Sequence, residues 1–105
     1  MTVHAEISIV PISKSHDTSM SKEVAAAFDA ISKIKDLKVT LTALGTQIEA
    51  KSLDGILQAI EAAHQAAKSA GASRIISTIR VDERLDKDQT LQDKVTSVKQ
   101  KLGNQ

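Results

Sequence analysis

The amino-acid sequence predicts an α+β fold, with one antiparallel sheet and helices packed on one of its faces. Two observations lead to this prediction. Stretches in which hydrophobicity alternates every second residue, as in half-buried strands, are interleaved with stretches of period near 3.6, as in amphipathic helices. Residues that commonly cap helices or form turns stand at the borders between them. The 105 residues leave room for a single domain, 1–105.

The chain opens with a predicted strand and a predicted helix. Aliphatic and polar residues alternate near residues 2–12, which indicates a strand. Pro11 has no N–H group, so we expect the hydrogen-bond ladder to weaken there. Apolar residues at three- and four-residue spacing predict a helix near residues 20–35, which Asp17 or Ser19 can cap.

Three further strands are predicted. Strands near residues 37–44 and 46–51 flank Gly45, a pattern typical of a hairpin with a tight turn. A fourth strand is expected near residues 73–83, after Gly71, which is placed to end the preceding helix with a left-handed residue.

Two further helices complete the pattern. The first spans residues near 53–70, after Ser52 at the cap position. The second spans residues near 90–102, where Thr90 and Asp93 have the spacing of a capping box. Its apolar stripe is narrow and its other faces are charged.

The predicted order of elements is therefore βαββαβ followed by a helix. Right-handed crossovers close such a chain into a ferredoxin-like sandwich with a four-stranded antiparallel sheet in the order 4-1-3-2. Strands one and three are then central, and both main helices cover one face. The opposite face of the sheet is left open.

Alternation along the strands predicts which side chains point at the open face. The set is Glu6, Ser8, Val10, Thr40, Thr42, Gln47, Glu49, Ile76, Thr78 and Arg80. Glu6 and Glu49 lie on neighbouring strands, where they repel unless Arg80, a proton or a cationic ligand lies between them. One interpretation is a pocket for a small polar or cationic molecule, closed by a second subunit. The alternative is a solvated face or a polar dimer interface.

Composition argues against several classes of function. Phe28 is the only aromatic residue, so the chain lacks the rings on which single-stranded nucleic acids stack. A formal charge of +1, well mixed along the chain, indicates neither a nucleic-acid nor a membrane surface. The absence of cysteine removes disulfides and thiolate metal sites. No signal peptide or membrane span is recognised, and we expect a cytoplasmic protein without a cofactor.

The histidines do not predict a metal site. His4, His16 and His64 lack the spacing of paired ligands, and we expect them at a strand edge, in a loop and on the flank of the second main helix. The pair Glu6 and Glu49 could act as acid and base. Nothing else in the chain suggests a reacting group, so no catalysis is expected.

The segments TVHAEISIVPIS, LTALGTQIEA and RIISTIRVDERLDK resemble the small thiamine-binding proteins, a family formerly grouped as uncharacterised. The similarity covers nearly the whole chain, although Ala43 and Leu44 replace the proline-like residue and methionine usual before the hairpin glycine. The resemblance implies a ferredoxin-like fold, a homo-oligomer that is typically a tetramer of paired dimers, and binding of thiamine or its hydroxymethylpyrimidine moiety without an established catalytic step.

Candidate ligand-binding residues follow from combining this resemblance with the open face. They are Glu6, Ser8, Thr42, Thr46, Glu49, Thr78 and Arg80. Carboxylates can interact electrostatically with the cationic thiazolium, and hydroxyls can form hydrogen bonds with the aminopyrimidine. We expect Glu49 to anchor the cation from the rigid middle of the sheet. The apolar residues Val10, Ile12 and Ile76 predict self-association. The alternative function is a structural or regulatory homo-oligomer that has no small-molecule ligand.

Overall fold

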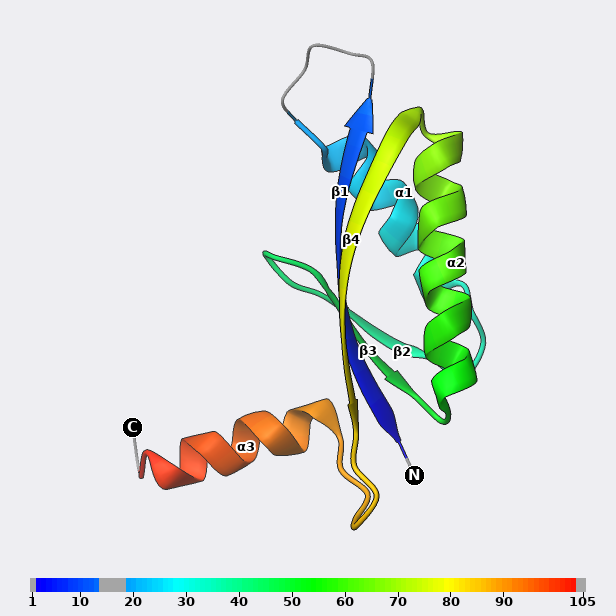
Figure 1. Ribbon diagram of the computed structural model, residues 1–105. Coiled ribbons are helices and arrows are strands. Elements are labelled where there is room, and N and C mark those ends of the chain that lie inside the picture. The colour runs from blue at the N-terminus through cyan, green and yellow to red at the C-terminus, as the bar shows by residue number, and fades with distance from the viewer. Residues whose placement is uncertain (1, 14–18, 104–105) are drawn as a thin grey trace.

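A computed structural model of the chain describes residues 2–13 and 19–103 (Figure 1). The elements, in chain order, are β1 (Val3–Ser13), α1 (Ser21–Ser32), β2 (Lys38–Leu41), β3 (Thr46–Ala50), α2 (Leu53–Ser69), β4 (Ala72–Glu83) and α3 (Leu91–Lys101). Both the predicted α+β class and the predicted order of elements are confirmed.

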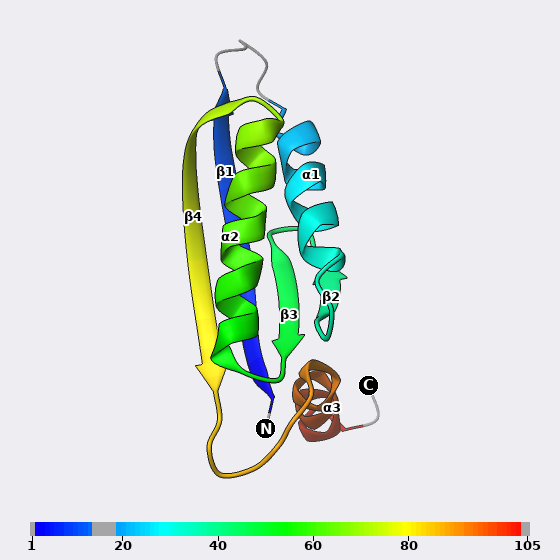
Figure 2. The ribbon, with the colours of Figure 1, turned by 90° about the vertical axis from the view of Figure 1, so that its right-hand side faces the viewer.

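The sheet has four antiparallel strands in the order β2-β3-β1-β4. This is the predicted order 4-1-3-2 read from the other edge. Figure 2 shows α1 and α2 side by side on one face of the sheet. In Figure 1, α3 extends away from the sheet on the opposite side from these two helices. The open face is therefore covered by neither of the two main helices.

The core lies between the sheet and the pair α1 and α2. Its largest fully buried side chains are Ile31, Ile48 and Ile56, one each from α1, β3 and α2. The other buried apolar residues are Val3, Ala5, Ile7, Ala27, Ala50, Ala59, Ala63 and Ala67. The alanines on the helices let the backbones approach closely, so a core can form from aliphatic residues alone.

Two strand ends differ from the prediction. β2 ends at Leu41 because Thr42 begins the turn: its N–H and its hydroxyl both donate to the carbonyl oxygen of Gly45, at 2.9 and 2.7 Å. β1 continues past Pro11 to Ser13, with a register shift only between Ile12 and Ser13.

The ladder is irregular near Pro11, as expected, because its register shifts between Ile12 and Ser13. Pro11 itself stays paired with Ile75 of β4, and the reason is geometric. In an antiparallel ladder the N–H and C=O of one residue point to the same side, and the side alternates along the strand. The carbonyl oxygen of Ile7 faces β3, since a Cβ on Gly45 would lie 3.0 Å from it. Pro11 is four positions further on, so its missing N–H belongs to the side away from β4 and costs no bond.

The helix caps follow the predictions to different extents. Thr90 and Asp93 form the predicted capping box, with bonds of 3.0 and 2.9 Å. Gly71 follows α2 with a φ of +113°, as its place after the helix predicted. Ser52 stands at the cap of α2 but makes no side-chain bond there.

The predicted cap of α1 is wrong in position. Met20 occupies the cap position, and the hydroxyl of Ser19 accepts from the Ser21 N–H at 3.4 Å. Asp17 lies outside the described residues, as does His16. Within the described part of the chain, none of the helices has the length and hydrophobicity to cross a membrane.

Candidate functional site

Two adjacent cross-strand rows carry most of the charged side chains of the open face. The strand register gives one row as Lys38, Glu49, His4 and Asp82, and the next as Thr40, Gln47, Glu6 and Arg80. Lys38 thus stands beside Glu49, and Glu6 beside Arg80, as cross-strand neighbours of opposite charge. Glu6 and Glu49 are not cross-strand partners, because Gln47 stands opposite Glu6 and His4 stands opposite Glu49.

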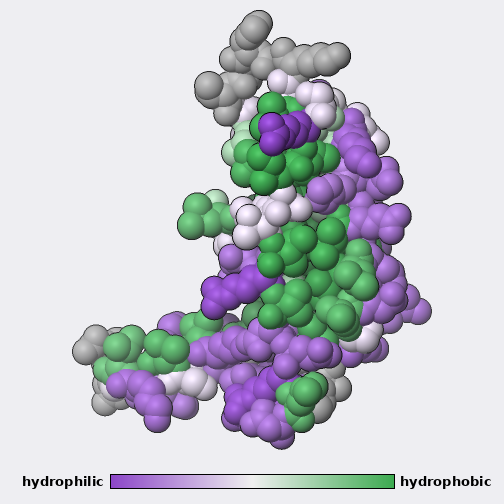
Figure 3. Space-filling model, in the orientation of Figure 1, coloured by the Kyte–Doolittle hydropathy of each residue, from purple (hydrophilic) through white to green (hydrophobic). Residues whose placement is uncertain are grey.

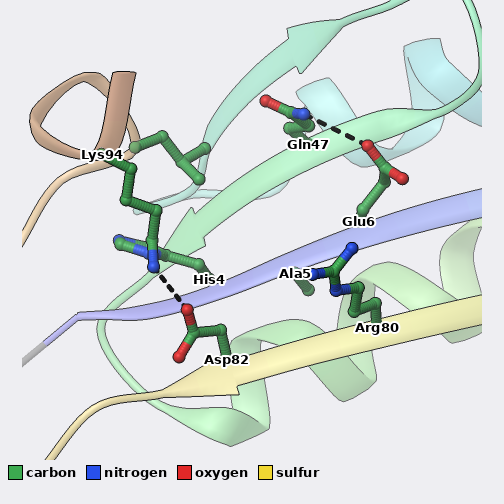
Figure 4. A pocket seen from close by; sticks show the side chains of 8 residues that line it. His4, Ala5, Glu6, Gln47, Arg80, Asp82 and Lys94 are labelled. Carbon is green, nitrogen blue, oxygen red and sulfur yellow. Dashed lines mark hydrogen bonds and ion pairs between the residues drawn. The ribbon is translucent and has the colours of Figure 1, made fainter. Parts of the chain in front are cut away.

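A cavity of about 200 Å³ lies over these rows, between the sheet and the first turn of α3 (Figure 4). Its lining residues are His4, Ala5, Glu6, Gln47, Arg80, Asp82, Leu91 and Lys94. All but the last two come from the central strands β1 and β3 and from β4. Backbone ladders hold these strands, so most of the cavity has a rigid base.

Glu6 and Arg80 face this cavity without being neutralised by each other. One carboxylate oxygen of Glu6 accepts from Nε2 of Gln47 at 3.1 Å. No ion pair joins Glu6 to Arg80, although they are direct register partners and both lie in the described part of the chain. Figure 4 shows the carboxylate turned toward Gln47 and away from the guanidinium. The cavity thus offers one acceptor and one cationic donor to an occupant.

Asp82 and Lys94 close the cavity at the end near α3. The Lys94 ammonium donates to the Asp82 carboxylate across the space between α3 and β4 (Figure 4). This hydrogen bond, and secondly the attraction of the positive charge of Lys94, lower the pKa of Asp82 below its ordinary value. The pair neutralises itself, so it serves as a wall of the cavity rather than as a free charge.

Glu49 holds the start of α3. Its carboxylate accepts from the backbone N–H of Leu91, the first residue of the helix, and only 9% of the residue is exposed. A carboxylate at a helix N-terminus satisfies an otherwise unpaired N–H and interacts favourably with the helix dipole. Glu49 is absent from the lining of the cavity and borders a separate depression with Lys38 and Lys51.

His4 is a buried residue of a central strand, so the expected strand-edge position is wrong. It is 5% exposed, between Glu49 on β3 and Asp82 on β4. The Thr2 hydroxyl lies 3.4 Å from its Nε2. Alternation puts His4 in the polar phase of the first strand, and in the structure it shares the lining of the cavity with Leu91 and Lys94 of α3.

The structure divides the seven predicted ligand-binding residues between different places. Glu6 and Arg80 line the cavity on the open face. Ser8, Thr42 and Thr46 line a second cavity of about 230 Å³, beside β1 where β3 no longer pairs with it. Thr78 is exposed on the open face and lines neither cavity, and Glu49 binds α3 as described.

Sequence reasoning missed four polar residues of the cavity. Gln47 was placed on the open face but not in the site, although it stands in the row of Glu6 and Arg80. Asp82 and His4 share the alternation of their strands and could have been found from it. Lys94 could not, because its position depends on where α3 lies. Within the described residues no three His, Asp or Glu side chains are grouped as metal ligands.

Comparison with known proteins gives the family. The family model described as thiamine-binding protein matches residues 5–99. The chain belongs to this family. It is 39% identical over 100 residues to a UPF0045 protein of Methanothermobacter thermautotrophicus, covering 95% of this chain and 99% of that protein. A UPF0045 protein of Methanocaldococcus jannaschii is 38% identical over 96 residues, covering 91% of each chain.

Solved structures share the fold. A crystal structure of a hypothetical protein of Methanocaldococcus jannaschii superposes with a TM-score of 0.82 at 38% identity, covering 93% of this chain and 96% of that one. A protein of Thermotoga maritima, assigned provisionally to thiamine biosynthesis or salvage, superposes with a TM-score of 0.76 at 18% identity. That match covers 93% of this chain and 99% of the other, and it concerns the fold alone.

Proposed function

We propose that this protein binds thiamine or a related hydroxymethylpyrimidine compound on the open face of its sheet, without a catalytic step. The observation that carries the proposal is the Glu6 carboxylate, which accepts from the Gln47 amide and makes no ion pair with the Arg80 guanidinium, with all three side chains grouped on paired strands under one cavity. Membership of the family described as thiamine-binding supports the choice of ligand.

These three side chains suit an aminopyrimidine ring. The ring carries an amino group that donates and nitrogens that accept, and the cavity presents the matching groups in one row. Glu6 can accept from the amino group, while Arg80 or Gln47 can donate to a ring nitrogen. A thiazolium cation, where the ligand carries one, can be attracted by the negative charge of Glu6. Ring contact has to come from aliphatic walls, since Phe28 is the only aromatic residue.

The size of the cavity favours a single-ring ligand or a shared site. About 200 Å³ is below the roughly 300–1,000 Å³ usual for small-molecule sites. A second copy of the chain could supply the missing walls. We therefore include self-association in the proposal, supported by the exposed apolar residues Val10, Ile12 and Ile76 on the open face.

Titration calorimetry with thiamine, its phosphates and hydroxymethylpyrimidine tests the proposal, with light scattering to give the oligomeric state. Glu6→Gln removes the charge but keeps the shape. Loss of a hydrogen bond to a charged group should weaken binding roughly 10- to 150-fold. Glu61→Gln, on the exposed side of α2, is the matched control and should bind like the wild type.

Two results would contradict the proposal. Equal affinity of Glu6→Gln and the wild type for the ligand would show that the ligand does not bind in this cavity. Absence of heat with every ligand, in a folded oligomer, would favour the alternative of a purely structural or regulatory assembly. The non-catalytic part is tested by mass spectrometry of the ligand after long incubation, which should recover it unchanged.

A further inference from the structure

The second cavity, of about 230 Å³, differs in its chemistry from the first cavity, which holds Glu6 and Arg80. Its walls come from β1, from α1 and from the hairpin between β2 and β3. Among the described residues that line it, none has an ionisable side chain. Placing a charge in such surroundings without a partner is costly. The second cavity therefore favours an uncharged occupant.

One residue of β1 directs unpaired backbone groups into this cavity. The ladder between β1 and β3 ends at the pair Ile7 and Thr46, whereas β1 continues to Ser13, past the hairpin (Figure 1). The N–H and C=O of Ile9 lie on the same side of the strand as those of Ile7, which face β3. Within the described residues neither group of Ile9 has a hydrogen-bond partner. Ile9 thus presents a donor and an acceptor side by side to the cavity that it lines.

Three hydroxyl groups also belong to the lining, and two of them are not used by the protein. The Thr42 hydroxyl donates to the carbonyl oxygen of Gly45 at 2.7 Å. The hydroxyls of Ser8 and Thr46 make no hydrogen bond to a described residue, although Thr46 is only 7% exposed. A buried hydroxyl without a protein partner bonds to water or to a ligand. Together with Ile9 these two residues offer four hydrogen-bonding groups to an occupant.

The other walls of the second cavity are aliphatic. They include Met20, Val24 and Ala27 of α1 and Leu41 and Leu44 of the hairpin. The two leucines are 61% and 85% exposed, and Figure 3 shows the apolar tip of the hairpin projecting from the body of the molecule. Covering such surface with a ring is favourable. A cavity of ~150 Å³ is enough for benzene, so the second cavity admits one ring with a small substituent.

We propose that the second cavity is a separate binding site for a small uncharged carboxamide, a single ring that carries a CONH₂ group. The amide oxygen has two lone pairs and the amide nitrogen has two hydrogens. The oxygen accepts from the Ile9 N–H and the Thr46 hydroxyl, and the nitrogen donates to the Ile9 carbonyl oxygen and the Ser8 hydroxyl. A ring nitrogen, which has one lone pair, would leave one of these groups unmatched. The site is independent of the first cavity and of its proposed ligand.

Three probes of nearly the same shape test the chemistry of the site. Benzamide carries a donor beside an acceptor, benzoate carries two acceptors and a negative charge, and benzamidine carries two donors and a positive charge. Each is titrated into the full chain and followed by the NMR shifts of backbone amides. Benzamide should shift Ile9, Gly45 and Thr46 most, saturably, at concentrations on the order of 1 mM. The two ions should bind at least about tenfold more weakly.

Thr46→Val removes the hydroxyl and keeps the shape of the side chain. Loss of one hydrogen bond between uncharged groups should weaken benzamide binding roughly 2- to 10-fold. Thr40→Val is the matched control, because Thr40 is exposed on β2 and lines neither cavity. This control should bind benzamide like the wild type.

Val24→Phe fills the cavity from α1 and should abolish benzamide binding. Val98→Phe makes the same change on the exposed stripe of α3 and should leave the binding unchanged. Thermal melts show whether each variant folds. If Val24→Phe does not fold, the three probes and Thr46→Val still decide the outcome.

Several results would overturn the proposal. They are the absence of a saturable shift at Ile9 and Thr46, equal binding of the three probes, and an equal effect of Thr46→Val and Thr40→Val. Shifts centred on Glu6 and Arg80 would show that benzamide binds in the first cavity instead. Glu6→Gln should bind benzamide like the wild type, and Thr46→Val should bind thiamine like the wild type. Failure of one proposal therefore leaves the other standing.

Discussion

Helices α2 and α3 are both amphipathic, but they are held in place in different ways. α2 buries Ile56, Ala59, Ala63 and Ala67 against the sheet. α3 buries no side chain, and its stripe residues Val95, Val98 and Leu102 are 47%, 60% and 55% exposed. Its start is instead attached by two polar contacts, Glu49 to the Leu91 N–H and Asp82 to Lys94. An apolar stripe thus predicts a helix, but not that the stripe is covered within the same chain.

The energetic difference between the two attachments is large. Burial of apolar surface contributes roughly 25 cal/mol per Å² and adds up along a helix. Exposed ion pairs contribute only about 0–1 kcal/mol, because water competes for both charges. We therefore expect α2 to unfold with the whole domain and α3 to open separately. The following predictions test this contrast, from the largest expected effect to the smallest.

Ile56→Ala should produce the largest loss of stability. Ile56 is completely buried at the centre of the face that α2 presents to the sheet. Removing a buried isoleucine to alanine costs about 2–5 kcal/mol, because transfer energy is lost and a cavity remains. Denaturant titration followed by circular dichroism measures the change. A loss below about 1 kcal/mol would mean that the site collapses freely and that the core is less rigid than its packing indicates.

Acid should release α3 and its linker before the core unfolds. The pKa of Asp82 is lowered by the hydrogen bond from Lys94, and that of Asp88 by bonds from the Thr2 N–H and hydroxyl. A carboxyl group whose pKa is lowered by folding stabilises the folded state fully when the pH is above its pKa in the unfolded chain, about 3.9. This contribution disappears as the pH falls through the lowered pKa of the folded state.

Hydrogen exchange read out by mass spectrometry between pH 7 and pH 3 checks the acid prediction. Protection of residues 91–101 should fall below about pH 4, while protection of α2 persists. Release of α3 already at pH 6, where these carboxyls remain ionised, would contradict the role assigned to Asp82 and Asp88.

Glu49→Gln should loosen α3 without unfolding the domain. The amide oxygen can still accept from Leu91, but the charge that favours the helix N-terminus is gone, a change of about 0.3–1 kcal/mol. Exchange at the first turn of α3 should accelerate a few-fold. If Glu49 instead anchors a ligand cation, as the sequence suggested, the affinity for thiamine should fall as well. Calorimetry on the variant therefore separates the two roles of this residue.

Val98→Ala should have the smallest effect. Val98 is more than half exposed on α3, so little surface is lost and no cavity forms. We expect a change in unfolding free energy within about 0.5 kcal/mol. A larger loss, together with a lower apparent mass in light scattering, would show that the stripe of α3 is covered by another copy of the chain.

The pattern of the strands and helices was enough to predict most of the fold. The period of two in β1 and β4, the hairpin around Gly45 and the box of Thr90 with Asp93 are local signals, and each is found in the structure. The boundaries that differ have local causes too. Thr42 turns the chain back by bonding Gly45, which the preceding run of strand-forming residues does not reveal.

The site was predicted less well, because it depends on contacts between distant segments. Alternation placed Glu6, Gln47 and Arg80 on one face, and the register then brought them into one row. The hydroxyls of Ser8, Thr42 and Thr46 are also polar groups that can bind a ligand, but they lie in a different cavity. β3 stops pairing with β1 at Ile7, and this second cavity lies beyond that point.

The sequence by itself determined the order of elements, the strand arrangement that follows from right-handed crossovers, and which side chains face away from the main helices. These features depend on the periodicity of apolar residues and on backbone chirality, which are properties of short segments of the chain. Only the tertiary structure decided that Glu49 binds the N-terminus of α3 and that Lys94 closes a cavity beside His4. Those outcomes depend on where α3 comes to lie and on how far each strand extends, and both are set by contacts between segments far apart in the chain.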